Sequence, residues 1–207
     1  MSEIEYFYSA HSAFAYLGSA RFMAIAKAAG RIIMHRPNDL RRVVPASGST
    51  RFSERSKGHY TYFFRREIDC WAEERNAPVM VGRPAHRDKD MTLGNGMLIA
   101  GLVQYKNIDQ LAHIMLESHW RDDSDLADRD TLIALARQVE MDPEPLLDAA
   151  LSEEVQAIYK ANTVEAIERA VFGSPAYFVD GDMFYGQDSL EMVERALRQP
   201  YAPSRTN

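Results

Sequence analysis

Apolar side chains recur at two different spacings along this chain of 207 residues. Near the amino end, residues 3–8 (EIEYFY) alternate loosely between polar and aromatic or branched side chains, which predicts a strand. Over residues 13–29 the apolar positions recur at helical spacing, and Gly30 is a stop signal for that helix. The β-branched stretch RIIMHRP (31–37) predicts a second strand. The chain therefore opens with a predicted βαβ unit.

In the middle of the chain, apolar residues recur at the spacing of helices, and this region is predicted to be helical. Residues 59–75 carry an aromatic stripe at i, i+3, i+4 spacing. Amphipathic helices are then predicted in GMLIAGLVQYK (96–106), IDQLAHIMLESHW (108–120), RDTLIALARQV (129–139), DPEPLLDAAL (142–151) and EEVQAIYKANTVEAIERAV (153–171). In the fourth of these segments, Asp142 can cap the helix and Pro143 suits its first position.

The pattern changes again near the carboxyl end. The stretch PAYFVDGDMFYG (175–186) places Asp180–Gly181 between two aromatic, β-prone arms, which predicts a hairpin. A last helix is expected over residues 189–198, with Asp188 as its cap and Glu191 completing a capping box. These elements predict a ββα unit that closes the chain.

A βαβ unit followed by a ββα unit is the thioredoxin-like arrangement within the α/β class. Neither terminal segment is long enough to bury a full core alone. We therefore expect residues 1–45 and 160–207 to pair into one thioredoxin-like sheet domain. Residues 46–159 would then form a large all-helical insertion domain.

Charge and composition narrow the classes of function. The net charge of −6 argues against a nucleic-acid platform, which needs a basic surface. The chain shows no apolar run of membrane-spanning length and no signal-peptide pattern, so a cytosolic protein without membrane contact is expected. The spacing of the histidines matches no metal-binding motif, so no metal is expected.

Cys70 is the one cysteine of the chain. A dithiol oxidoreductase needs two thiols, so that class of enzyme is excluded. Because Cys70 lies between Ile68 and Trp71 among apolar neighbours, we expect its thiol to be buried and inert.

Ser12 stands where the first strand gives way to the first helix. Its structural role there is to cap the helix. A hydroxyl at the positive end of a helix can also stabilise a thiolate, which here would have to come from a cosubstrate such as glutathione. Lowering the pKa of a thiol by about two units is worth about 2.7 kcal/mol, which one charge-assisted hydrogen bond and a helix terminus can supply together.

The same stretch resembles a known family. EYFYSAHSAFAYLG (5–18) is similar to the opening of the 2-hydroxychromene-2-carboxylate isomerase and kappa-class glutathione transferase family. The resemblance implies that Ser12 is the serine that activates glutathione. Ala13 stands where the family usually has proline, so the helix start is kept but the turn loses some preorganisation.

A second resemblance lies near the carboxyl end. VFGSPAYFVDGDMFYGQDSLEMVERAL (171–197) is similar to the closing segment of the same family. The resemblance implies a cis peptide bond between Ser174 and Pro175, with main-chain groups of Ser174 facing the cysteinyl unit of glutathione. It also implies that Gln187 and Asp188 hold the γ-glutamyl end.

A third, weaker resemblance covers SKGHYTYFFRREI (56–68), which is similar to a Lys-Gly-x-Tyr helix start in the family. It implies that Lys57 meets a carboxylate of glutathione, and Ser49 falls near a family asparagine of the same site. His11 is expected either on the substrate side of the site or as a plain turn residue. The aromatic side chains expected either in the core or around an aromatic substrate are Phe14, Tyr60 and Phe64.

The resemblance implies a glutathione-dependent isomerase. Its substrate would be 2-hydroxychromene-2-carboxylate, or a related intermediate of aromatic breakdown, and its product trans-o-hydroxybenzylidenepyruvate, formed through reversible addition of a thiolate. A kappa-like glutathione transferase or peroxidase would use the same site with another electrophile. A non-catalytic thioredoxin-fold binding module is the third possibility. A homodimer is expected by analogy with the family.

Overall fold

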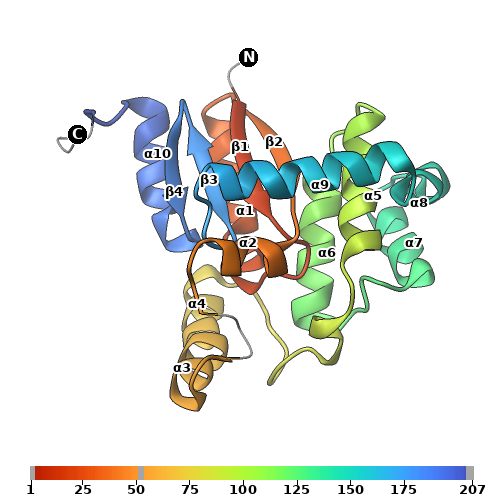
Figure 1. The fold of residues 1–207 in the computed structure, drawn as a ribbon, viewed down its shortest axis with the longest axis horizontal. Coiled ribbons are helices and arrows are strands. Elements are labelled where there is room, and N and C mark those ends of the chain that lie inside the picture. The colour runs from red at the N-terminus through yellow and green to blue at the C-terminus, as the bar shows by residue number, and fades with distance from the viewer. Residues whose placement is uncertain (1–2, 51–53, 204–207) are drawn as a thin grey trace.

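The computed structural model describes residues 3–50 and 54–203, and Figure 1 shows their arrangement. Within these residues four strands form one sheet, in the order β2-β1-β3-β4. The strands are β1 (Glu3–Tyr8), β2 (Ile32–Pro37), β3 (Ala176–Val179) and β4 (Asp182–Tyr185). Strand β1 is parallel to β2 and antiparallel to β3, and β3 is antiparallel to β4. The two ends of the chain therefore pair through β1 and β3, as the sequence predicts.

Helices cover both faces of the sheet, because alternate side chains of a strand point to opposite sides. The covering helices are α1 (Ala13–Ala28), α2 (Leu40–Ala46), α9 (Glu153–Glu168) and α10 (Leu190–Arg198). On one face, Tyr6 and Tyr177 stack on each other and pack against Phe22 of α1. On the other face, Phe7 and Phe178 share a buried cluster with α2 and α9, and α9 crosses in front of the sheet in Figure 1.

The block between β2 and β3 is helical, which confirms the predicted insertion of helices. Its further helices are α3 (Lys57–Thr61), α4 (Glu67–Arg75), α5 (Thr92–Val103), α6 (Asp109–Asp122), α7 (Arg129–Gln138) and α8 (Pro143–Ala150). The aromatic stripe predicted as one helix is divided by a π-helical turn, η2 (Tyr62–Arg66). Helix α2, which Asp39 caps, has no counterpart among the predicted elements.

Several local predictions are confirmed. Asp142 caps α8 by accepting from the Glu144 amide, and Pro143 is its first residue. The hairpin turns at Asp180 and Gly181, both with positive φ, 50° and 100° respectively. These backbone angles are those of the tight hairpin turn that an Asp-Gly pair favours.

Two sequence predictions are wrong. Asp188 does not cap the last helix: a short 3-10 turn, η4 (Gln187–Ser189), comes first, and α10 begins after Ser189 without a side-chain cap. Cys70 is exposed rather than buried. Successive helical residues point about 100° apart. The burial of Ile68 therefore does not extend to Cys70, two positions further along α4.

The core of the sheet continues into the helical block. Met97 of α5, Leu111 and Trp120 of α6 belong to the same buried cluster as Tyr6 of β1. Helix α9 runs unbroken through residue 160, where the boundary of the insertion domain is expected, so that division stays a prediction. No helix of residues 3–50 and 54–203 has both the length and the apolar character needed to cross a membrane.

Candidate functional site

Ser12 lies at the junction of β1 and α1, at the carboxyl end of the strand. Its Oγ accepts a hydrogen bond from the Ala15 amide at 3.3 Å, so the predicted helix cap is confirmed. The same hydroxyl donates to the main-chain oxygen of Ser174 at 3.2 Å. A residue from the first turn of the fold is thereby brought into contact with one 162 positions away.

The peptide bond between Ser174 and Pro175 is cis, as the resemblance of the closing segment implies. Within the described part of the chain the buried Oγ of Ser174 has no hydrogen-bond partner. Gly173 packs directly beneath the ring of Tyr185, and a Cβ at this position would overlap that ring. The loop before β3 therefore places Ser174 against Ser12, with the aromatic ring of Tyr185 beside it.

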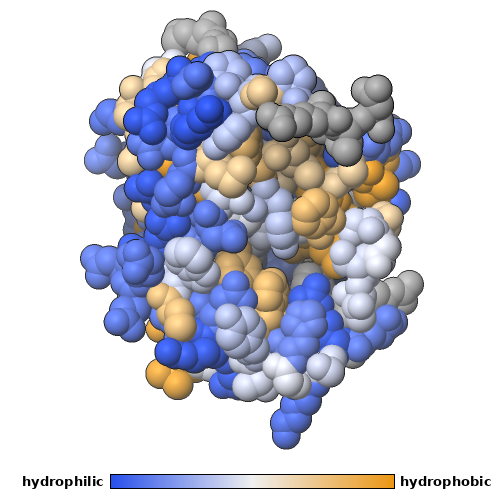
Figure 2. Space-filling model, turned by 90° about the vertical axis from the view of Figure 1, so that its left-hand side faces the viewer, coloured by the Kyte–Doolittle hydropathy of each residue, from blue (hydrophilic) through white to orange (hydrophobic). Residues whose placement is uncertain are grey.

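A small cavity of about 40 Å³ opens at Ser12. Its aromatic wall consists of Phe14, Phe63, Phe64, Phe172 and Tyr185. Its polar lining consists of His11, Ser12, Ser174, Arg55 and Arg87. The predicted pocket residues His11, Phe14 and Phe64 thus lie at the same cavity as Ser12. On the face seen in Figure 2, apolar side chains border a hollow near the middle of the surface.

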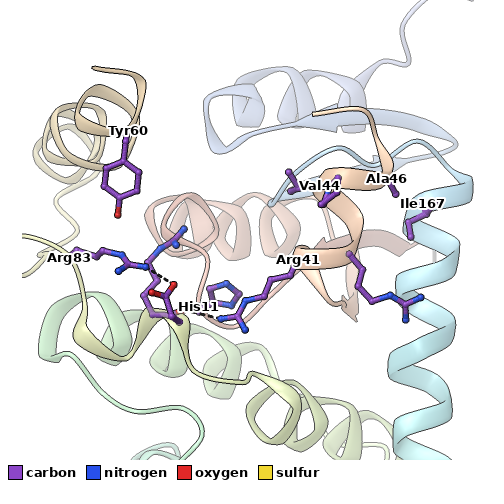
Figure 3. Close-up of a pocket in the computed structure, with 11 residues that line it drawn as sticks. His11, Arg41, Val44, Ala46, Tyr60, Arg83 and Ile167 are labelled. Carbon is purple, nitrogen blue, oxygen red and sulfur yellow. Dashed lines mark hydrogen bonds and ion pairs between the residues drawn. The ribbon is translucent and has the colours of Figure 1, made fainter. Parts of the chain in front are cut away.

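A larger cavity of about 880 Å³ adjoins the small one, and His11, Val44 and Arg87 line both. The arginines around the larger cavity are Arg41 and Arg42 of α2, and Arg83 and Arg87 from the segment before α5 (Figure 3). Among the described residues that line it, Asp88 is the one acidic side chain. Burial and the nearby charge of Arg83 lower the pKa of Arg87 to about 10, so it stays a cation at neutral pH. Tyr60, also predicted for the pocket, lines this larger cavity.

Gln187 and Asp188 lie in the turn between β4 and α10. Gln187 is buried, and its side-chain oxygen accepts from Nε of Arg75 at 3.0 Å. In the described residues its amide nitrogen, Nε2, is buried without a hydrogen-bond partner. Burial and, second to it, the charge of Asp188 raise the pKa of Glu67. The turn therefore combines an unpaired amide donor with acidic charge.

Two of the predicted glutathione residues lie apart from this group. Lys57 is the exposed first residue of α3. Ser49 is half-buried, and its hydroxyl lies 3.0 Å from that of Ser47. In the described residues Ser12 and Ser174 line the small cavity, whereas the other predicted glutathione residues line neither cavity, namely Ser49, Lys57, Pro175, Gln187 and Asp188. Their assignment to the glutathione site stays a prediction.

Some residues of the site carried no sequence signal. Asn95 of α5 is fully buried and hydrogen-bonds to both Ala10 and Ser9 in the turn before α1. Trp120 of α6 bonds to the main chain of His11. These contacts join positions more than 80 residues apart, and a single sequence has no local pattern that marks them. Among the described residues no group of three or more His, Cys, Asp and Glu side chains has the arrangement of a metal site.

The fold and this site define a thioredoxin-like protein in which a serine stands at the start of the first helix. The DSBA-like thioredoxin domain family matches residues 3–198, and the chain belongs to that family. The predicted fold class is thereby confirmed.

The resemblance to isomerases is confirmed by curated relatives named 2-hydroxychromene-2-carboxylate isomerase. The relative from Sphingobium xenophagum is 25% identical over 194 residues, covering 94% of this chain and 97% of its own. The relative from Pseudomonas sp. (strain C18) is 26% identical over 195 residues, covering 94% of this chain and 89% of the length of that relative.

Solved structures show the same fold. A 2-hydroxychromene-2-carboxylate isomerase superposes with a TM-score of 0.77 at 22% identity, over 95% of this chain and 94% of that one. Cytosolic disulfide reductase DsbM from Pseudomonas aeruginosa, solved with GSH, has a TM-score of 0.63 at 14% identity, over 96% and 93%. At these identities the likeness is one of fold alone.

Proposed function

We propose that this protein is a glutathione-dependent isomerase of 2-hydroxychromene-2-carboxylate or of a related aromatic ketoacid precursor. One observation carries the proposal: Ser12 caps α1 at a small aromatic cavity that adjoins a larger cavity lined with arginines. The relatives named as isomerases support the choice of reaction.

Polar groups of the loop before β3 and of the turn after β4 suit glutathione. Ser174 Oγ and Gln187 Nε2 are buried polar atoms without partners in the described chain, and such atoms are costly unless a ligand or water pairs with them. The acidic pair of Glu67 and Asp188 suits the ammonium group of a γ-glutamyl end. Main-chain groups of Ser174 and Pro175 would face the cysteinyl unit.

Bound glutathione would supply a thiolate. The hemiketal ring of the substrate would open by cleavage of its ring C–O bond, with the hydroxyl proton passing to the phenolic oxygen and a ketone left behind. The C–S bond would then form as the π pair of the conjugated double bond moves to this ketone oxygen, and both changes would reverse after rotation about the former double bond. The part of Ser12 is to turn its O–H from the Ser174 carbonyl toward the sulfur and hold it as an anion. The positive end of α1 adds to this stabilisation. The aromatic wall, including Phe14 and Phe64, excludes water from the reacting atoms.

The larger cavity suits the substrate. An aromatic acid needs an apolar surface for its ring and cations for its carboxylate. Val44 and Tyr60 provide the first, and Arg41 and Arg87 provide the second. Since His11 and Arg87 line both cavities, a substrate in the larger one reaches the sulfur site.

The decisive experiment measures conversion of 2-hydroxychromene-2-carboxylate by purified protein with and without glutathione. We expect turnover only with glutathione, and calorimetry should detect glutathione binding at millimolar concentrations or below. Turnover of a chloronitrobenzene in place of the chromene would favour the kappa-like transferase. Absence of glutathione binding would contradict the proposal and favour a non-catalytic module. A cytosolic location and a homodimer stay predictions.

A further inference from the structure

We propose that His11 is a catalytic residue of this reaction: its Nε2–H donates a hydrogen bond to the substrate oxygen that takes up the electron pair. The inference rests on the proposed function and adds to it a residue that no glutathione contact requires. Three properties of the His11 ring support it, namely its position, its tautomer and its charge.

The position of His11 joins the two halves of the site. It is buried, it precedes Ser12 directly, and it lines both the small cavity at Ser12 and the larger one. In Figure 3 its imidazole lies beside the end of the Arg41 side chain. Its main-chain oxygen accepts from Trp120 Nε1 at 3.0 Å, so the turn that carries the ring is held in place.

A chain of hydrogen bonds sets the tautomer of His11, and it begins at a main-chain amide. The Ala10 amide donates to Oδ1 of Asn95 at 3.0 Å, so the other terminal atom of that side chain is the nitrogen. This nitrogen donates to Ser9 Oγ at 3.2 Å and to the Tyr159 hydroxyl at 3.1 Å. Both of its protons are then used, and Ser9 Oγ is an acceptor toward Asn95.

The hydroxyl of Ser9 has a single proton to give. Its second recorded partner is Nδ1 of His11, 2.9 Å away. When Ser9 donates its proton to Nδ1, each polar atom in the series from Asn95 through Ser9 to His11 has a hydrogen-bond partner. In this arrangement Nδ1 is the acceptor. A neutral imidazole with an acceptor at Nδ1 carries its proton at Nε2. Ser9 and Asn95 are therefore positioning residues for a donor on the opposite side of the ring.

The surroundings keep the ring uncharged. Burial first, and then electrostatic repulsion from Arg87, from His119 in its protonated form and from Arg41, hold the pKa of His11 well below its ordinary value of 6.5. The titratable side chains that face the ring or line cavities with it in the described residues are the arginines Arg41, Arg42, Arg55, Arg83 and Arg87, the acids Asp39, Asp88 and Asp90, the tyrosines Tyr60, Tyr159 and Tyr185, and His119. At neutral pH the ring is therefore a neutral hydrogen-bond donor beside two arginines.

This placement matches the chemistry of a ketoacid. The ketone oxygen of such a substrate is attached to the carbon next to the carboxylate, so a donor beside Arg41 and Arg87 lies where that oxygen falls when they hold the carboxylate. A preorganised donor aimed at developing negative charge is worth about 100- to 1,000-fold in rate. His11 has this role without giving up a proton, and the hydrogen bond is restored when the electron pair returns.

The first test does not depend on activity. Nitrogen-detected NMR of ¹⁵N-labelled protein at neutral pH should show His11 with a protonated Nε2 and an unprotonated Nδ1. The His11→Gln variant identifies the resonances by their loss. In Ser9→Ala, the tautomers should become mixed. A dominant Nδ1–H tautomer or a doubly protonated ring in the wild type would overturn the inference.

The second test distinguishes the effect of losing the N–H donor of His11 from the effect of losing its imidazole ring. His11→Phe should lower kcat about 100-fold, as the loss of one such donor does elsewhere, with glutathione affinity within about twofold of wild type. His11→Gln keeps an N–H donor, so its kcat should be at least tenfold higher than that of His11→Phe. Because the ring is neutral, the wild-type kcat should show no inflection near the ordinary pKa of 6.5. His113→Phe, outside both cavities, is the matched control and should behave as wild type.

The outcomes distinguish the two proposals. An inactive wild type would overturn the proposed function, and this role with it. An active wild type whose His11→Phe variant is equally active would overturn the role of His11 alone. Trp120 bonds to the main chain of His11, so these variants keep that contact, and circular dichroism checks that they fold.

Discussion

Trp120 donates its indole Nε1–H to the main-chain oxygen of His11 across 3.0 Å. Trp120 is buried in α6 of the helical block, and His11 lies in the turn that leads from β1 to α1. Asn95 of α5 makes a second such link through the Ala10 amide. The helical block therefore supports the turn that presents Ser12, in addition to lining a cavity.

Ser12→Ala should separate the cap from the chemistry. Loss of the bond from the Ala15 amide should lower the free energy of unfolding by about 1 kcal/mol, measured by urea denaturation. Turnover with glutathione should fall about 10- to 100-fold, because the thiolate loses its hydroxyl donor. Ser152→Ala is the matched control, since Ser152 caps α9 with the same 3.3 Å bond outside both cavities. Equal activity of the two variants would contradict the role of Ser12.

Arg41→Gln should weaken binding of the carboxylate substrate. Its guanidinium lines the larger cavity and is held by the main-chain oxygen of Lys89 at 2.9 Å. Loss of one charged hydrogen bond is expected to raise KM about 10-fold, with little change in glutathione affinity. Arg137→Gln, on the exposed side of α7, removes the same charge elsewhere and should leave KM unchanged. An unchanged KM in Arg41→Gln would place the carboxylate elsewhere.

Gly173→Ala should disturb the small cavity. A Cβ at Gly173 would overlap the ring of Tyr185, so the ring must move. We expect about 10-fold weaker glutathione binding by calorimetry, at the lower end of the cost of overpacking. Gly58→Ala in α3 is the control, because nothing lies within 4 Å of its added Cβ. Full affinity in Gly173→Ala would show that Tyr185 does not shape this binding site.

The ion pair of Glu5 and Arg169 should give a defined pH dependence of stability. A hydrogen bond from Arg169 lowers the pKa of Glu5 below its ordinary 4.5, against a smaller opposing effect of burial. A carboxyl group whose pKa is lower in the folded state stabilises the protein at any pH above its pKa in the unfolded state. This stabilisation is lost as the pH falls through the pKa of the folded state. Glu5→Gln should therefore unfold more easily than wild type at neutral pH, and the difference should disappear well below pH 4.5.

The control for this pH series is Glu3→Gln. Glu3 is an exposed carboxylate on the same strand, β1. The Glu3→Gln substitution should change the urea midpoint of unfolding little at any pH. A difference between Glu5→Gln and wild type that persists in strong acid would show that the pair acts through packing rather than charge.

Cys70 should react without affecting catalysis. Its side chain is exposed on α4 and lies outside both cavities. An alkylating reagent such as iodoacetamide should therefore modify one thiol in the folded protein, displacing iodide and leaving a thioether that glutathione does not reverse. Glutathione-dependent turnover of the modified protein, after removal of excess reagent, should equal that of Cys70→Ser. Loss of activity on modification, but not in Cys70→Ser, would indicate that α4 moves during turnover.

The elements of the fold and one part of the site were readable from local patterns. Strand alternation, helical spacing and the Asp180–Gly181 turn act over a few residues, so the strands and most helices follow from neighbours in the chain. The cap at Ser12 belongs to a short motif of the same kind, whereas the cis peptide before Pro175 was expected from the resemblance of the closing segment to a known family. The predictions at Asp188 and Cys70 failed because a cap depends on where the helix begins, and burial depends on what covers it.

The amino-acid sequence by itself determined the thioredoxin-like order of elements, the serine at the start of α1 and the absence of a second thiol. Only the tertiary structure decided that Asn95 and Ser9 orient His11, and that arginines from α2 and from the segment before α5 meet around one cavity. The physical reason is distance along the chain. Hydrogen bonds and charges that join segments more than 40 residues apart arise from packing, which no local pattern records.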